Sequence, residues 1–283
     1  MTTPPSGPTR NEALQQLIRA ALRQLQRGWT LLTTAQDRVL RALATARRRG
    51  ARPRAVPLAV REALKAFTTA TSRFHTDLGA LVERWTAIDL PTAYRLGADD
   101  ALDTAVLAPG TQRPAFTWTP AHQSALATLV STSYAALMGR VTDTVRRAQA
   151  FARAVTSAVR STSPPTAKDL TAAHRLDTVT YEHGARHPVL SWARTALTAQ
   201  ALTAANTGAL TATTADLAAR WVQVTDGPEC GWSVHTDSDL AHNTLRSAAE
   251  AAAHPIAHPG CLRRFIPRPD LNDNPAIEEG QHP

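Results

Sequence analysis

Cysteine and histidine occur together in only one part of this 283-residue chain, near its C-terminal end. The pairs Cys230/His235 and His258/Cys261 would supply two thiolates and two imidazoles, a donor set that suits tetrahedral zinc. Each pair lies in or beside a turn that contains Gly and Pro, and such turns hold two ligands on one side of an ion. The sequence therefore predicts a zinc site at these four residues, with His254 as the substitute ligand if His235 points away.

A second interpretation of these residues stays open, because the spacing differs from the repeated Cys-x-x-Cys pattern of many zinc modules. In that interpretation the two cysteines are small buried thiols and the histidines cap turns. The nearby Asp226, Asp237 and Asp239 would then serve turns, or would orient imidazoles if a metal is bound. His75 and His122 stand isolated in the sequence and support no metal site.

The same region permits a catalytic alternative, a metal-dependent nuclease of the His-Asn-His type. Its residues would be His235, His242, Asn243, His254 and His258, with one histidine as general base and the others on a metal. Pro255 and Pro259 interrupt the helical register that such a site needs. The chain contains neither a Gly-rich phosphate loop nor a Gly-x-Ser-x-Gly elbow, and no segment is left for an ADP-ribosyltransferase or protease domain. We expect no enzymatic activity.

Two long helices precede this region. Between Asn11 and Arg48, apolar residues recur at spacings of three and four, which writes one stripe along a helix of roughly 55 Å. The same spacing returns from Pro57 to Asp89, after a break that contains Gly50 and Pro53. A stripe of this length stays exposed unless a neighbouring helix covers it, so the two segments predict a long antiparallel helical hairpin.

The remaining pattern predicts a mainly α fold, in which a helical body follows the hairpin and precedes a small α+β C-terminal module. Further helices are expected at 91–106, 120–159, 167–183 and 188–220, the second starting at Thr119-Pro120. A strand at 221–224, a helix at 244–253 and an extended segment at 262–266 follow, and the two extended segments can pair. The predicted regions are a disordered leader (1–10), two helical regions (11–110 and 111–220), the Cys/His module (221–268) and a disordered tail (269–283).

Charge indicates a polyanionic partner. The chain has 31 Lys and Arg against 23 Asp and Glu, a formal charge of +8. We expect nonspecific contact with double-stranded DNA, aided by an arginine cluster at the hairpin turn (Arg47, Arg48, Arg49, Arg52 and Arg54). A G/C-rich genome and a solvated loop would produce the same features. No run approaches the ~18 apolar residues of a membrane span and the N-terminus lacks a secretory signal, so no membrane partner is expected.

Several segments of the C-terminal part resemble the signature of the phage head morphogenesis family, the minor head proteins of tailed bacteriophages similar to that of phage Mu. They are Trp221–Trp232, His235–Asp239 and His254–Phe265, preceded by the helix-pair segments Thr178–Gly184 and Thr195–Gly208. The chain keeps His-Pro-Gly-Cys at its closing turn but has Leu262 and Arg263 where a second cysteine is common. It also has a Cys-Gly-Trp knuckle in place of Cys-x-x-Cys, and so is similar to an actinobacteriophage variant.

The resemblance implies a structural assembly factor rather than an enzyme. A protein of this family is made in the host cytoplasm and is present in a few copies inside the procapsid near the portal, in the head interior of the virion. Its implied partners are the portal protein, other capsid or scaffold proteins, and packaged double-stranded DNA that lies within reach.

Overall fold

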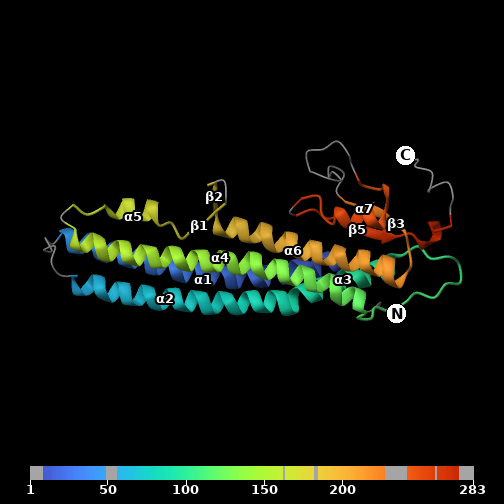
Figure 1. Cartoon of the computed structure of the whole chain (residues 1–283), viewed down its shortest axis with the longest axis horizontal. Coiled ribbons are helices and arrows are strands. Elements are labelled where there is room, and N and C mark those ends of the chain that lie inside the picture. The colour runs from blue at the N-terminus through green and yellow to red at the C-terminus, as the bar shows by residue number, and fades with distance from the viewer. Residues whose placement is uncertain are drawn as a thin grey trace, which may run out of the picture. The chain divides into compact units, whose positions relative to one another are not determined.

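Long helices dominate the computed structural model, which describes residues 9–48, 56–161, 163–181, 184–226, 241–258 and 260–273. The longest are α1 (Arg10–Arg48), α2 (Leu58–Arg84) and α4 (Pro120–Arg160), and Figure 1 shows them as parallel and antiparallel rods. The mainly α fold class is therefore confirmed. The predicted leader and tail lie largely outside the described residues. Among the described residues, no helix is both long and apolar enough to cross a membrane.

The chain forms two compact units, and each is discontinuous in sequence. Unit 1 comprises Met1–Ala20, Arg84–Ser133 and Arg194–Pro283, and unit 2 comprises Ala21–Glu83 and Tyr134–Ala193. The predicted helical regions were continuous, whereas α1, α4 and α6 (Val189–Thr211) each contribute to both units. Three of the boundaries between the units therefore fall inside these helices, at Ala20/Ala21, Ser133/Tyr134 and Ala193/Arg194.

Unit 2 contains the predicted antiparallel hairpin. Trp29 of α1 meets Phe74 of α2 edge to face, with ring centroids 4.7 Å apart. Close by, Gly28 faces Leu78, where an added Cβ would overlap the leucine side chain. Phe67 of α2 makes a second edge contact, 5.2 Å between centroids, with Phe151 of α4. The apolar stripes read from the sequence therefore pack against one another, as a buried stripe requires.

The helical prediction for 167–183 is confirmed only for Ala167–Ala173, and the helix predicted from 188 begins at Val189, because a β-hairpin lies between the two helices. Helix α5 covers only Ala167–Ala173, and strands β1 (Thr178–Thr180) and β2 (Arg186–Pro188) pair antiparallel. Side chains from α1 and α4 occupy the carbonyls that a helix would use. Trp29 Nε1 donates to Leu176 O (3.1 Å), Arg147 Nη1 to Arg175 O and Thr178 O (2.6 and 2.9 Å), and Arg140 Nη1 to Thr180 O (3.0 Å).

Unit 1 depends on a close crossing of α3 (Leu90–Thr104) and α6. A Cβ on Gly97 of α3 would overlap the backbone of Ala205, and a Cβ on Gly208 of α6 would overlap the backbone of Tyr94. Each helix thus contributes one glycine to the crossing. The backbones approach to a separation that no side chain at either glycine would permit.

The C-terminal module of unit 1 is a three-stranded antiparallel sheet with one short helix. Its strands are β3 (Trp221–Thr225), β4 (Leu245–Ser247) and β5 (Arg264–Pro267), in the order β4-β3-β5, with helix α7 (Ala248–Ala253) after β4. The predicted pairing of the two extended segments is confirmed, since Val224 lies opposite Phe265. The predicted helix at 244–253 is shorter, because a Ser247/Glu250 capping box starts α7 only at Ala248.

Candidate functional site

Half of the predicted zinc site is a formed turn, and the other half lies outside the described residues. Cys230 and His235 belong to the segment 227–240, which the structure does not describe. His258 and Cys261 lie in one tight turn, in which Cys261 N donates to His258 O at 3.0 Å and Gly260 adopts φ +93°. The Cys261 side chain is buried, with 1% of its surface exposed. The backbone of this second pair therefore forms one turn.

Within the described residues, no group of three or more His, Cys, Asp and Glu gathers as a metal site. The substitute ligand His254 ends α7, where its N–H donates to Ala251 O at 3.1 Å. His242 Nδ1 accepts a hydrogen bond of 3.1 Å from the backbone N–H of Asp226. The four-ligand zinc prediction accordingly stays a prediction that depends on where 227–240 lies.

An ion pair between Asp226 and Arg263 is the central contact of the C-terminal module. Arg263 Nε and Nη2 both donate to Asp226 Oδ2, at 3.0 and 2.6 Å, and neither side chain is exposed. Arg263 Nη1 donates to His254 O at 2.9 Å. One guanidinium therefore joins the end of β3, the end of α7 and the start of β5. The other carboxylate oxygen, Asp226 Oδ1, is buried without a hydrogen-bond partner among the described residues.

A second buried arginine ties the start of α1 to this module. Arg10 Nη2 donates to Asn206 Oδ1 at 2.5 Å, Arg10 Nη1 donates to Arg263 O at 3.5 Å, and Asn206 Nδ2 donates to Pro255 O at 2.6 Å. Burial lowers the pKa of Arg10 to about 10, although the nearby carboxylate of Asp100 opposes that shift. Even so, the side chain stays cationic at neutral pH.

Asp100 of α3 balances part of this positive charge. It accepts two hydrogen bonds from Arg264 of β5, at 2.6 and 3.1 Å, and lies 3.9 Å from Arg10 Nη1. Three arginines and two carboxylates thus form one largely buried network in unit 1. These groups form hydrogen bonds and ion pairs with one another and with backbone carbonyls, so their role is structural.

A second cluster in unit 1 joins Tyr94, His122 and Asp216. Tyr94 Oη lies 2.9 Å from His122 Nδ1, and His122 Nε2 lies 3.0 Å from Asp216 Oδ2, while His122 is fully buried. Phe116 and Trp118 pack edge to face around the imidazole, and Trp118 also stacks on Tyr94 at 5.8 Å. The cluster therefore pins the segment that leads into α4 against α3.

His122, which stands isolated in the sequence, acquires its partners through the fold. Its partners are 28 and 94 positions away and come from α3 and from the π-helical turn Ala212–Asp216. No short-range spacing connects such residues. Burial raises the pKa of Tyr94 to about 12, with a hydrogen bond to Thr211 opposing the shift and the charge of Asp216 adding to it.

Comparison of the chain with protein-family models, with curated protein sequences and with solved structures finds no significant match. Functional argument for this chain therefore starts from its own residues, from their geometry and from the sequence resemblance described above.

We predict that Arg263→Met destabilises the C-terminal module by about 3–5 kcal/mol, because it leaves Asp226 buried without its cation. The double variant Asp226→Leu/Arg263→Met should recover much of that loss, since it removes both charges. Arg268→Ala is the matched control, because its pair with Asp270 is partly exposed and should contribute under about 1 kcal/mol. Hydrogen exchange of the β3 and β5 amides measures the effect. Equal losses in Arg263→Met and Arg268→Ala would contradict the central role of the buried pair.

We also predict that Tyr94 makes unit 1 sensitive to alkali. Its folded pKa of about 12 exceeds the ordinary value of 10.0, so its contribution is complete below pH 10 and is lost as the pH rises through 12. The stability difference between wild type and Tyr94→Phe should therefore shrink across this window. Arg10 acts with the opposite sign there, because its pKa is lowered, but it is common to both proteins and cancels. Urea unfolding at several pH values tests this, with the exposed Tyr134→Phe as control. Parallel pH profiles for wild type and Tyr94→Phe would refute it.

Proposed function

We propose that this chain is a minor head protein of a tailed bacteriophage, a structural assembly factor that associates with the portal inside the procapsid. The observation that carries the proposal is the convergence of two resembling segments that are distant in sequence. Trp221–Trp232 supplies β3 and Asp226, while His254–Phe265 supplies the Cys261 turn, Arg263 and the start of β5. The described residues of these two segments therefore belong to one module, in which Val222, Val224 and Phe265 share a buried core.

This module exposes an apolar side chain that a protein partner could cover. Leu262 is 56% exposed, although both of its chain neighbours, Cys261 and Arg263, are buried and fixed. An exposed apolar side chain on an immobilised backbone loses little conformational entropy when a partner covers it. We accordingly assign Leu262 to the surface that meets the portal or another head protein. The role requires positioning and no catalysis.

One zinc ion would complete the module. The buried thiol of Cys261 and the imidazole of His258 in the same turn fit half of a structural zinc site, and Cys230 and His235 would supply the other half. Such an ion would cross-link the turn to the segment between β3 and β4. In a module of this size, metal binding contributes directly to folding.

For zinc, we expect elemental analysis of the purified protein to find about one ion per chain. Cys261→Ser should lose the ion and expose the β3 and β5 amides to exchange, whereas His187→Ala, an exposed residue of unit 2, should keep it. A wild-type protein without stoichiometric metal would refute the zinc proposal.

For the assembly role, we expect the protein to co-purify with the portal protein of its own phage when the two are co-expressed. Leu262→Asp should abolish the complex, because it places a charge on the proposed contact. Leu58→Asp is the matched control, an exposed leucine of unit 2 that is 67% accessible. Absence of a complex with portal would overturn the proposal. Nicking of supercoiled plasmid in the presence of magnesium or manganese would instead support the nuclease alternative.

A further inference from the structure

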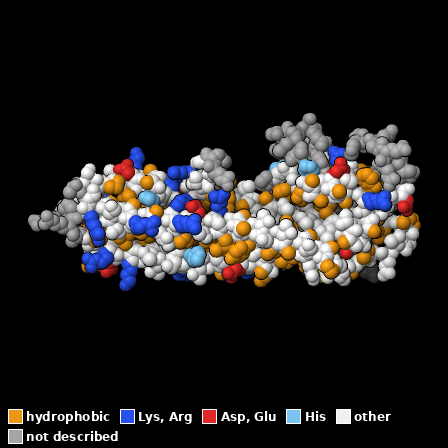
Figure 2. Space-filling model, viewed as in Figure 1, with side chains coloured by type: hydrophobic (Ala, Val, Ile, Leu, Met, Phe, Trp, Pro, Cys, Tyr) orange, Lys and Arg blue, Asp and Glu red, His pale blue; other side chains and the backbone are white. Residues whose placement is uncertain are grey.

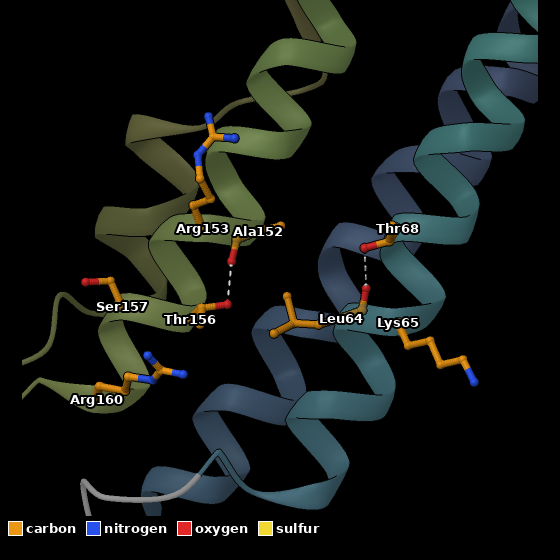
Figure 3. A pocket seen from close by; sticks show the side chains of 8 residues that line it. All are labelled: Leu64, Lys65, Thr68, Ala152, Arg153, Thr156, Ser157 and Arg160. Carbon is orange, nitrogen blue, oxygen red and sulfur yellow. Dashed lines mark hydrogen bonds between the residues drawn. The ribbon is translucent and has the colours of Figure 1, made fainter.

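Unit 2 contains a groove between α2 and α4 with a volume of about 550 Å³. Leu64 and Lys65 of α2 and Ala152, Arg153 and Arg160 of α4 are among the residues that line it, and Leu64 points from α2 toward α4 (Figure 3). A smaller hollow of about 80 Å³ adjoins it and shares Ala152. The groove is therefore an open channel along the seam between two helices rather than an enclosed cavity.

The cations of this groove are unneutralised. No salt bridge within the described residues includes Lys65, Arg153 or Arg160, and no Asp or Glu lines the groove. Other arginines of the same unit are paired, as in Arg73–Asp77 (3.3 Å) and Arg147–Asp143 (2.9 Å). The three groove cations thus keep their full charge available to an external anion.

The arrangement of these cations favours an extended anion over a small one. In Figure 3, Arg153 and Arg160 extend from α4 in different directions and Lys65 extends from α2 away from α4, so the three do not converge on one point. The hydroxyl of Thr156 donates to Ala152 O of its own helix at 2.9 Å, and so it is not directed at a ligand. A single phosphate would meet at most one or two of these groups, whereas a chain of phosphates can meet all three.

Charge is also distributed unequally between the two units. Unit 2 has 20 Lys and Arg against 8 Asp and Glu, or +12, whereas unit 1 has 11 against 15, or −4. If only the described residues are counted, the balances are 17 against 7 and 11 against 10. Figure 2 shows blue Lys and Arg side chains gathered over the elements of unit 2. The electrostatic attraction for a polyanion therefore arises from unit 2.

We propose that the α2/α4 groove binds double-stranded DNA through its phosphate backbone, without sequence preference. The predicted arginine cluster at the hairpin turn is not needed, and three of its members, Arg49, Arg52 and Arg54, lie outside the described residues. Single strands are disfavoured because the nearest rings, Phe67 and Phe151, are buried and offer no surface on which bases can stack. The proposal does not depend on the head-assembly role.

Fluorescence anisotropy with a labelled duplex of about 20 base pairs tests the proposal, with salt varied from about 50 to 200 mM. The groove variant is Lys65→Gln/Arg153→Gln/Arg160→Gln. Its matched control is Arg19→Gln/Arg95→Gln/Arg194→Gln, which removes three exposed charges from unit 1. We expect the groove variant to bind at least about tenfold more weakly at low salt, and the slope of log affinity against log salt concentration to become less steep by about 2.7. The control should change affinity less than about threefold.

Three results would overturn the proposal. Equal weakening in both variants would assign binding to net charge alone, and unchanged binding by the groove variant would place the contact elsewhere. If a single strand, or polyglutamate at matched salt, binds more tightly than the duplex, then duplex DNA is not the ligand of this groove. Because the portal experiment uses Leu262 in unit 1 and no DNA, its failure and a failure here are distinguishable.

Discussion

A guanidinium that is fully removed from water must find both a counter-charge and acceptors for its N–H groups, and Arg263 finds them in two other parts of the chain. Asp226 at the end of β3 supplies the charge and His254 at the end of α7 supplies a carbonyl. The carbonyl of Arg263 itself receives Arg10 from the start of α1. The positions of the sheet, of α7 and of the first helical turn are therefore interdependent, because moving any one of them would strand a buried charge.

Local periodicity predicted most of the helical fold, because a helix with one buried face has an apolar residue at every third or fourth position. Helices α1, α2 and α4 have such stripes, and Thr119-Pro120 marks where α4 begins. The β1–β2 hairpin was not predicted, since what excludes a helix there is donation from Trp29 and Arg147 to its carbonyls. Those donors are remote in sequence, and the residues of the hairpin itself do not indicate these hydrogen bonds.

The site residues divide in the same way. His258 and Cys261 are three positions apart, and their shared turn followed from Gly and Pro around them. The Asp226–Arg263 pair spans 37 positions, so its residue types alone suggested only turn or supporting roles. The net charge of +8 did not indicate where the basic surface lies, since it is the sum of +12 in unit 2 and −4 in unit 1. The three-dimensional arrangement of the segments is needed to identify the Asp226–Arg263 pair and to assign the charge to each unit.

The nested order of the two units has a consequence for the chain during its synthesis. Every segment of unit 2 has been made once Ala193 is added, whereas unit 1 needs residues from both ends of the chain. Arg10 is translated 253 positions before Arg263, whose carbonyl oxygen accepts its hydrogen bond. Because the ribosome synthesises the N-terminal part first, unit 2 can bury its core before the residues that contact the first turn of α1 have been made. That turn stays exposed to solvent until then. The core of unit 1 is then buried after the core of unit 2.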